Sequence, residues 1–274
     1  MPADLHIHSR LSDGTDSPEE IVAMAKAGGL TAISITDHDM TDGIEPARAL
    51  GKEVGLELIP GIEFTTDSTG TELHILGYFI NYQDPQFMAA LEKIQADRVN
   101  RIYRIVDKLK ELNIAIEADD VFALSGKKAP GRPHVARAMI KKGFVSSFKE
   151  AFNRYLDSRG PAYVPHFKML PNETIQLITS CGGIAVFAHP AVSNCDQLIP
   201  GLMADGLKGI EAYYSGHRPD QTEHYLGLAQ KYGLLVTGGS DYHGENSGRE
   251  IKLGQFNIPD QLVEKLKDEH LRGN

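Results

Sequence analysis

Cysteine is scarce in this sequence: only Cys181 and Cys195 occur among 274 residues. Two cysteines cannot build a disulfide framework, and their spacing does not match a thiolate metal site, so we interpret both as reduced thiols. Long apolar runs are also lacking, and no segment approaches the roughly 18 residues that a membrane span requires. Because the first apolar strand begins almost at the first residue, no room is left for a signal peptide, and we expect a cytoplasmic protein without a membrane partner.

Basic residues do not predominate either, and the formal net charge is -9. This charge argues against a broad basic face that tracks long duplex nucleic acid. It does not exclude a small anionic substrate, because divalent cations bound among carboxylates would reverse the local sign. The patterns G-x-x-x-x-G-K-[ST] and G-x-S-x-G are absent, which argues against an NTPase or a serine hydrolase.

Apolar runs rich in β-branched residues alternate with helical patterns over much of the chain. The expected strands are residues 4–8, 30–36, 56–63, 72–78, 184–188, 207–213 and 234–237. One helix is expected to begin at the capping box Ser17-Pro18-Glu19-Glu20, and another at a cap on Asn172. Repeated strand and helix units indicate an α/β fold with parallel strands, whose active site lies at the carboxyl ends of the strands.

Only helical patterns occur between the fourth and fifth of these strands. A long helix is expected over residues 85–113, and shorter ones near 118–124, 133–141 and 147–156. We interpret residues 98–165 as a helical insertion or cap that divides an α/β domain into residues 1–97 and 166–274.

The first strand, Asp4-Leu5-His6-Ile7-His8, carries two histidines on one face. Successive side chains of a strand point to opposite faces, so Leu5 and Ile7 would enter the core while His6 and His8 could hold one ion together. Asp13 follows just after the strand and could add a carboxylate. The motif alone is weak, because roughly 0.4 H-x-H matches arise by chance in a chain of this composition, and two structural histidines explain it equally well.

Further histidines and carboxylates fall in or just after the expected strands. Together with the first strand's residues they are His6, His8, Asp13, His38, Glu63, His74, His189, Asp241 and His243. A single one, such as His74 between apolar neighbours, is better explained as a core residue. If all of them lie together at the carboxyl ends of the strands, however, so many buried charges would be costly without cations. The sequence therefore predicts a metal site.

The order of these motifs resembles the polymerase and histidinol phosphatase (PHP) family. The motifs are H-x-H, S-D-G, T-D-H, G-x-E, a lone strand histidine, A-H-P and S-D-x-H, and they cover nearly the whole chain with no expected ligand missing. The resemblance implies a distorted (β/α)7 barrel with up to three divalent ions at its mouth.

The resemblance also implies how the ligands are shared. The first ion would be held by His6, His8, Glu63 and Asp241. The second would be held by Glu63 as a bridge with His74 and His189, and the third by Asp13, His38 and His243. Imidazole and carboxylate ligands without thiolate suit Mn, Zn or Fe better than Mg or Ca, and Mn is the first choice.

Two turn-rich segments narrow the resemblance to one branch of the family. Gly131-Arg132-Pro133-His134 and Gly160-Pro161-Ala162-Tyr163-Val164-Pro165 are similar to segments of the branch that removes the 3′-phosphate from nucleoside 3′,5′-bisphosphates and trims short RNA from its 5′ end. Arg132 would bind a phosphate, with His134 donating beside it. The further candidates for substrate contact are Lys168, His217 and Arg218, for each of which a surface or structural role is the alternative.

The hypothesised reaction is hydrolysis of a phosphate monoester by water that bound cations activate. A proton donor for the leaving oxygen would be His243 or His134, which the sequence does not rank. Three alternatives stay open: a 5′-3′ exonuclease on short 5′-phosphorylated RNA, a histidinol-phosphate phosphatase, and a non-catalytic metal-binding scaffold. The expected partner is a small phosphorylated nucleotide or short oligonucleotide, and the sequence makes no prediction of the oligomeric state.

Overall fold

The strands of the protein form two sheets in the computed structural model, which describes residues 2–68, 70–125, 128–165, 167–247 and 250–273. A four-stranded sheet has the order β3-β2-β1-β9, and a five-stranded sheet has the order β4-β5-β6-β7-β8. The strands of the first sheet are β1 (Pro2–Ile7), β2 (Ala32–Ile35), β3 (Glu57–Leu58) and β9 (Ile258–Pro259). Those of the second are β4 (Gly61–Ser68), β5 (Thr71–Tyr78), β6 (Ile184–Phe187), β7 (Gly209–Tyr214) and β8 (Leu235–Gly239).

The predicted parallel pairing holds for only part of each sheet. Strands β1, β2 and β3 are parallel, as are β6, β7 and β8. In contrast, β4 and β5 form an antiparallel hairpin, and β5 is also antiparallel to β6. The expected strand at residues 56–63 is divided, since Pro60, which has no N–H to donate, lies between β3 and β4. Glu63 therefore lies near the beginning of a strand, and the prediction that it ends one is wrong.

The two sheets meet beyond the carboxyl ends of β1 and β2. Isolated bridges join Ile7 to Tyr242 and His38 to Glu63. The N–H of Asp241 also donates to the carbonyl of His6 at 2.9 Å. The α/β class is thus confirmed, but among the described residues the strands do not form one continuous closed ladder, so the (β/α)7 barrel stays a prediction.

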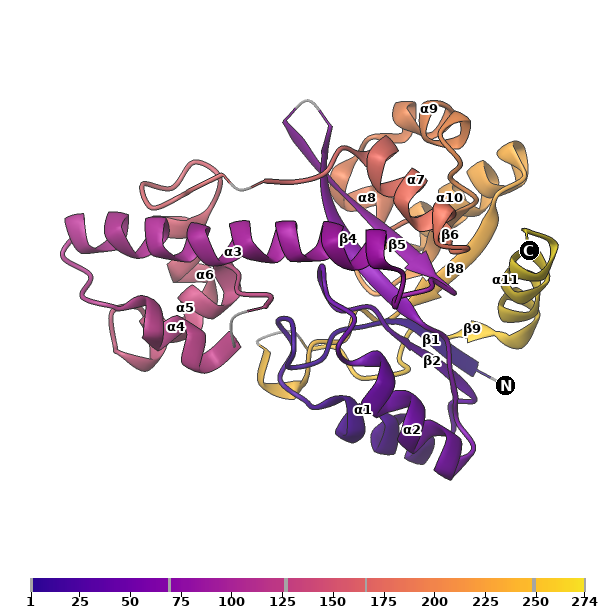
Figure 1. Cartoon of the computed structure of the whole chain (residues 1–274), viewed down its shortest axis with the longest axis horizontal. Helices are drawn as coiled ribbons and strands as arrows, with labels where there is room; N and C mark the ends of the chain where they lie inside the picture. Colours follow the sequence, from indigo (N-terminus) through magenta and orange to yellow (C-terminus); the bar gives the residue numbers. More distant parts are fainter. Residues whose placement is uncertain (1, 69, 126–127, 166, 248–249, 274) are drawn as a thin grey trace.

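Helices cover the outer faces of both sheets. Helix α1 (Pro18–Ala27) has the predicted capping box, in which the Ser17 hydroxyl accepts from the N–H of Glu20 and the Glu20 carboxylate accepts from the N–H of Ser17. Helix α7 (Pro171–Ser180) is preceded by Leu170 rather than by the expected cap at Asn172. The other helices outside the insertion are α2 (Ile44–Val54), α8 (Pro190–Ser193), α9 (Ile199–Ala204), α10 (Pro219–Tyr232) and α11 (Asp260–Gly273). Figure 1 shows α1 and α2 beside β1 and β2, on the opposite side from α7, α9 and α10.

The expected insertion is helical and extends to one side of the sheets (Figure 1). It consists of α3 (Pro85–Glu111), α4 (Ala118–Ser125), α5 (Arg132–Lys141), α6 (Phe148–Ala151) and a π-helix (Phe152–Leu156). We call these elements the cap. Their apolar side chains, from Ile102 to Val164, form a cluster separate from those of the sheets. The expected boundary at residue 98 falls inside α3, the one at 166 lies outside the described residues, and the division into domains stays a prediction.

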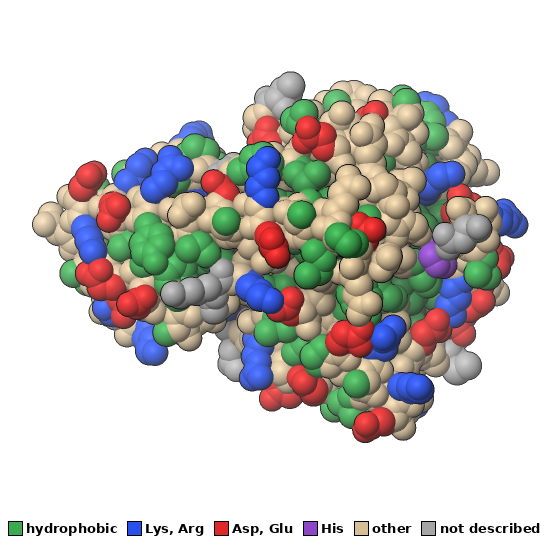
Figure 2. All heavy atoms as spheres, in the orientation of Figure 1, with side chains coloured by type: hydrophobic (Ala, Val, Ile, Leu, Met, Phe, Trp, Pro, Cys, Tyr) green, Lys and Arg blue, Asp and Glu red, His purple; other side chains and the backbone are tan. Residues whose placement is uncertain are grey.

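Acidic and basic side chains are interspersed over the face drawn in Figure 2, with hydrophobic side chains between them. Among the described residues, no helix is both long enough and apolar enough to cross a membrane.

Candidate metal centre

Strand β1 and His8, the residue that follows it, bring the two histidines together as the alternation predicts. Both side chains are buried, and their Nε2 atoms lie 3.1 Å apart. Leu5 and Ile7 are completely buried on the other face of the strand. The two imidazoles therefore present nitrogen atoms to the same point, as a chelate requires.

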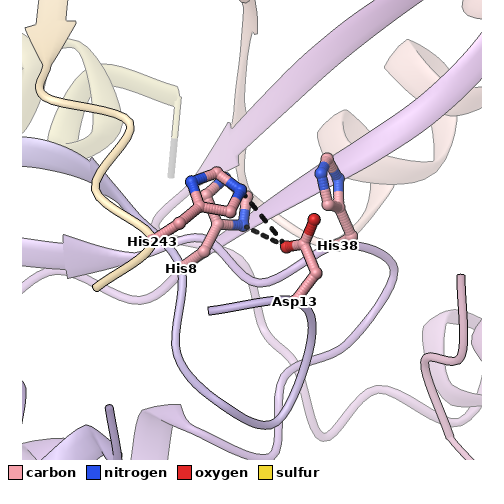
Figure 3. Close-up of side chains that lie close together, drawn as sticks. All are labelled: His8, Asp13, His38 and His243. Atoms are coloured by element: carbon pink, nitrogen blue, oxygen red, sulfur yellow. Dashed lines mark ion pairs between the residues drawn. The ribbon is translucent and has the colours of Figure 1, made fainter. Parts of the chain in front are cut away.

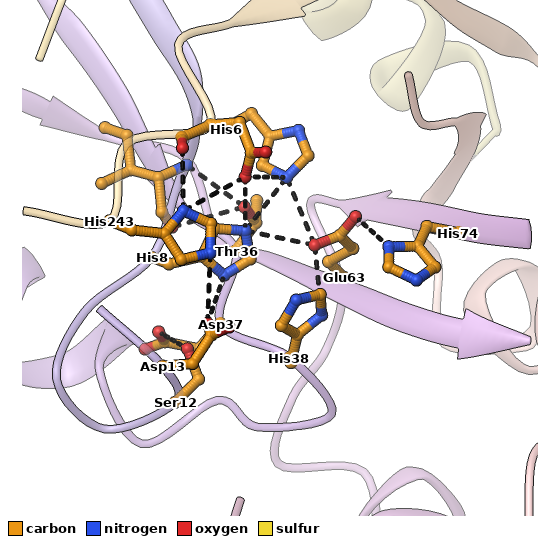
Figure 4. Close-up of polar contacts among 12 residues, drawn as sticks. His6, His8, Ser12, Asp13, Thr36, Asp37, His38, Glu63, His74 and His243 are labelled. Carbon is orange, nitrogen blue, oxygen red and sulfur yellow. Dashed lines mark hydrogen bonds and ion pairs between the residues drawn. The ribbon is translucent and has the colours of Figure 1, made fainter. Parts of the chain in front are cut away.

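Glu63 lies at the middle of the cluster (Figure 4). Its Oε2 atom is within ion-pair distance of three imidazoles, at 3.3 Å from His6, 3.1 Å from His8 and 3.2 Å from His38. Its Oε1 atom lies 2.8 Å from His74 Nδ1 and 2.9 Å from His189 Nε2. One carboxylate thus faces two groups of histidines, which is the position expected of a bridging ligand.

A second group of side chains lies on the other side of His8 (Figure 3). His8, Asp13, His38 and His243 each offer one atom, and these atoms lie within 4.8 Å of one another. We call these four residues the outer cluster. The same distance criterion unites three more groups: His6, His8 and Asp241; His6, Glu63 and His189; and His38, Glu63 and His74. Every predicted ligand is therefore in one cluster, although His8 and His38 are shared more widely than the resemblance implies.

Several atoms of the outer cluster fit a cation better than any partner in the described chain. His8 Nδ1, Asp13 Oδ1, His38 Nδ1 and His243 Nε2 are buried and have no hydrogen-bond partner among the described residues. Buried polar atoms that form no hydrogen bond are costly, and imidazole nitrogen with carboxylate oxygen is a donor set that Mn, Fe and Zn accept. The residues present fit divalent cations, whereas the assignment of each ligand to an ion stays a prediction.

The carboxylates also determine which imidazoles carry charge in the metal-free protein. Burial opposes a charge on His8, but Asp241 and Glu63 raise its pKa to about 9. Burial likewise opposes a charge on His74, and Glu63 and Glu72 raise its pKa to about 10. Burial dominates at His38 and lowers its pKa to about 3. Cation binding would therefore displace protons from His8 and His74, because a ligating imidazole nitrogen is deprotonated.

The outer cluster opens onto a cavity of about 240 Å³. Its lining includes Asp13, His38 and His74 together with three arginines, Arg98, Arg101 and Arg132, of the cap. Arg101 is buried and donates to the carbonyl of Val164, and within the described residues it has no ion pair. Burial, with Arg132 and Arg98 nearby, lowers its pKa to about 10. Arg98 is paired with Asp39, whereas Arg101 and Arg132 have no carboxylate partner among the described residues, and such guanidinium groups favour an anionic ligand.

The motif order and this geometry agree with a comparison of the sequence with models of known protein families. A family model described as the PHP domain matches residues 4–163. The chain belongs to the PHP family.

Three PHP-family relatives act on different phosphate esters. A 5′-3′ exoribonuclease of Haemophilus influenzae is 36% identical over 88% of this chain and 89% of its own length. A 3′,5′-nucleoside bisphosphate phosphatase of Chromobacterium violaceum is 30% identical over 89% of this chain and 88% of its own. A phosphoribosyl 1,2-cyclic phosphate 1,2-diphosphodiesterase of Eggerthella lenta is 29% identical over 94% of this chain and 100% of its own.

One solved structure shares the whole architecture. It is a chain from Bifidobacterium adolescentis that has been assigned as a metal-dependent phosphoesterase. Its TM-score is 0.90 and its sequence identity 32%, with 96% of this chain and 94% of that chain covered.

One residue that the sequence analysis missed supports the histidines of the candidate metal centre. Glu211 of β7 is completely buried, and its carboxylate accepts from His6 Nδ1 at 2.9 Å and from the N–H of His189 at 2.7 Å. It thereby orients two predicted ligands. A carboxylate inside the apolar segment 207–213 was the available signal, since a buried charge requires partners.

The two candidate proton donors do not fit that role equally well. His243 Nδ1 lies 2.8 Å from the carbonyl of Asp241, which it can reach only as a donor, so Nε2, at 3.3 Å from Asp13, is the nitrogen that could bind a cation. This orientation suits a metal ligand. His134 is completely buried at the beginning of α5 and does not line the cavity, and its Nδ1 accepts from the N–H of Gly131 at 3.2 Å. Burial lowers its pKa to about 4, so it is neutral at pH 7.

The predicted substrate contacts are divided between the cavity and other places. Arg132 lines the cavity and also an adjoining one of about 450 Å³, where Lys168 lies as well. Lys168 is paired with Glu72 at 2.5 Å. His217 is buried and bonds to the carbonyl of Ala212, and Arg218 is exposed and paired with Asp220. The structure does not bring His217 or Arg218 to either cavity.

Proposed function

We propose that the protein hydrolyses the 3′-phosphate of nucleoside 3′,5′-bisphosphates to give the 5′-nucleotide and phosphate. Membership of the PHP family makes the chain a metal-dependent hydrolase of phosphate esters, and the identity of the ester is what we propose. One observation carries the proposal: a single cavity is lined both by histidines of the candidate metal centre and by three arginines.

A substrate with two phosphates matches the two parts of this cavity. The arginines would bind the 5′-phosphate, because a guanidinium group can donate two parallel hydrogen bonds to phosphate oxygens. Arg101 and Arg132 are the best placed, since Arg98 is already paired with the buried carboxylate of Asp39. The 3′-phosphate would then lie at the side of the cavity formed by Asp13, His38 and His74.

The chain's own residues would hold and orient the reacting groups. The clusters around Glu63 would hold up to three divalent cations, Mn first and Zn or Fe next, which would lower the pKa of water and neutralise charge on the phosphoryl oxygens. The attacking water oxygen forms a bond to phosphorus, the bond from phosphorus to the 3′ oxygen breaks, and that oxygen takes up a proton. The products are a nucleoside 5′-phosphate with a free 3′-hydroxyl and inorganic phosphate.

A second candidate, 5′-3′ exonuclease activity on short 5′-phosphorylated RNA, requires the same bond to break. In an oligonucleotide, breaking the bond to the 3′ oxygen of the first nucleotide releases the rest of the RNA chain, whereas in the bisphosphate it releases inorganic phosphate. The adjoining cavity, which shares Arg132 and His74 with the first and is also lined by Tyr163 and Lys168, gives room for that chain. The Haemophilus influenzae relative favours this candidate too.

A substrate panel separates these functions from the rivals. Purified protein with Mn²⁺ would be assayed on adenosine 3′,5′-bisphosphate, adenosine 3′-phosphate, 5′-phosphorylated and 5′-hydroxyl tetraribonucleotides, a phosphoribosyl 1,2-cyclic phosphate and histidinol phosphate. We expect the bisphosphate to be turned over fastest, followed by the 5′-phosphorylated RNA. Faster turnover of histidinol phosphate would overturn the proposal, and no turnover of any ester would favour a scaffold. Arg132→Ala should impair only the 5′-phosphorylated substrates, with exposed Arg104→Ala as control.

A further inference from the structure

All four residues of the outer cluster lie outside the strands, His8 directly after β1 and His243 after β8. Asp13 belongs to the loop between β1 and α1, and His38 follows β2. Figure 3 shows the Asp13 carboxylate paired with His8 and His243, and His38 beside it. A loop ligand needs contacts that hold its backbone in place, because connecting segments are more mobile than the elements they join.

The Asp13 loop is held between β1 and the cap. On the side of the first sheet, Gly14 approaches the end of β1 so closely that an added Cβ would lie 2.3 Å from the carbonyl oxygen of His8. On the cap side, Arg137 of α5 donates from Nη2 to the carbonyl of Asp13 at 2.7 Å and from Nη1 to the carbonyl of Gly14 at 3.4 Å. The guanidinium group of Arg137 thus holds two successive peptide groups of the loop, those with the carbonyls of Asp13 and Gly14.

The loop after His38 is held by the other long cap helix. Arg98 of α3 donates from Nε to the Asp39 carboxylate at 2.9 Å, and Gln95 of α3 donates to the Asp39 carbonyl at 3.0 Å. Asp39 itself has a φ of 50°, a left-handed conformation that a non-glycine residue adopts at a cost. Contacts from the cap therefore hold the residue next to His38 in an unfavourable backbone conformation.

We propose that the cap assembles the outer metal site, with Arg137 as the positioning residue for Asp13 and Arg98 as that for His38. The inference rests on the proposed function in one respect, namely that the outer cluster holds a cation. The cluster of His6, Glu63 and His189 has no such dependence, because Glu211 of the second sheet orients two of its members. Loss of a cap contact should therefore remove one cation and leave the others.

The same helix also connects the outer site to the substrate cavity. Helix α5 begins at Arg132, which lines the cavity, and Arg137 lies five positions later in the sequence. A substrate phosphate that orders Arg132 would also order the helix that holds Asp13. The two binding equilibria are therefore linked. The product 5′-nucleotide should raise the affinity of the outer cluster for its cation, and the cation should raise the affinity for the nucleotide by the same factor.

The test compares Arg137→Gln, Arg137→Lys and Arg154→Gln by their metal content and Mn²⁺ dependence. Arg154 is exposed and paired with Glu150, so its variant is the matched control. We expect Arg137→Gln to retain one Mn less per chain than the wild type after gel filtration, as measured by mass spectrometry of the metal. Its Mn²⁺ requirement for activity should rise roughly ten- to a hundredfold, and saturating Mn²⁺ should restore kcat. Lysine, which keeps the positive charge and a longer reach toward a carbonyl than glutamine, should rescue part of the affinity.

Three results would overturn the proposal: unchanged metal content in Arg137→Gln, an equal loss of all bound Mn, or a lysine variant no better than glutamine. If Arg137→Gln does not fold, the lysine variant and the wild type still decide the question, because adenosine 5′-phosphate must lower the Mn²⁺ concentration that half-saturates the weakest site of the wild type. Wild-type protein that binds no Mn would instead refute the metal-dependent function on which the inference rests.

Discussion

The carboxylate of Glu211 lies 2.9 Å from His6 Nδ1 and is completely buried. The Nδ1–H group of the imidazole donates to this carboxylate, so Nε2 is left to face Glu63 and His8. A partner of this kind fixes the tautomer and the orientation of a ligating histidine.

Replacement of Glu211 should weaken metal binding without touching a metal ligand. We expect Glu211→Ala to lower the affinity for Mn²⁺ by roughly ten- to a hundredfold, since His6 loses its acceptor and the N–H of His189 is left unpaired. Glu211→Gln should fall between this variant and the wild type, because an amide oxygen can still accept one of the two bonds. Isothermal titration with Mn²⁺ measures the effect, and Glu223→Ala, at an exposed position of α10, is the control. An alanine variant with wild-type affinity would show that Glu211 only fills space.

Local rules of the sequence predict the candidate metal ligands, and the structure gathers these side chains in one cluster. Alternation along β1 placed His6 and His8 on one face, and the capping box at Ser17 correctly began α1. Sequence reasoning did not find the hairpin of β4 and β5, although only residues 69 and 70 separate the two strands. A parallel crossover needs a dozen or more residues, so this short connection already required an antiparallel turn.

Residues whose role depends on tertiary neighbours were not found in this way. Arg101 is one of several polar residues along α3, and only the packing of the cap shows that it is buried against the cavity beside Arg132. His217 and Arg218 line neither cavity, because position after a strand does not determine the direction of a side chain, and their roles stay predictions. The predicted metal ligands therefore lie in one cluster, whereas the predicted substrate contacts do not share one cavity.

Arg101 should contribute to affinity only for substrates that carry a 5′-phosphate. A hydrogen bond to a charged group contributes about 1.5–3 kcal/mol to the free energy of binding. Arg101→Met should therefore raise KM for adenosine 3′,5′-bisphosphate roughly ten- to a hundredfold. The KM for adenosine 3′-phosphate, which has no group for Arg101 to bind, should stay as in the wild type. Steady-state kinetics on both substrates, with exposed Arg104→Met of the same helix as control, measure this difference. Equal effects on the two substrates would place the 5′-phosphate elsewhere.

Removal of cations should lower the thermal stability of the protein. Without them, the carboxylates of Asp13, Glu63 and Asp241 are buried beside imidazoles whose nitrogen atoms approach one another. Mn²⁺ at 100 times its dissociation constant should stabilise the folded state by about 2.7 kcal/mol, which corresponds to a rise of roughly 5–10 °C in Tm over protein in EDTA. Mg²⁺ at the same concentration should produce a much smaller rise, because it prefers ligand sets made only of oxygen. Scanning fluorimetry distinguishes the cases, and an equal response to both ions would contradict the histidine-rich site.

His134 should make the protein sensitive to acid through its burial. In the unfolded chain its pKa is about 6.5, whereas burial lowers the folded value to about 4. As the pH falls from 7 to 5, the unfolded state takes up a proton that the folded state does not, so the free energy of unfolding should fall by about 2 kcal/mol from this residue. His134→Gln removes the titrating group but keeps an acceptor for the N–H of Gly131, the bond that His134 Nδ1 forms at 3.2 Å. Urea unfolding of both proteins in EDTA at pH 7 and pH 5 should show the larger loss in the wild type. Parallel losses would mean that His134 is protonated inside the folded protein.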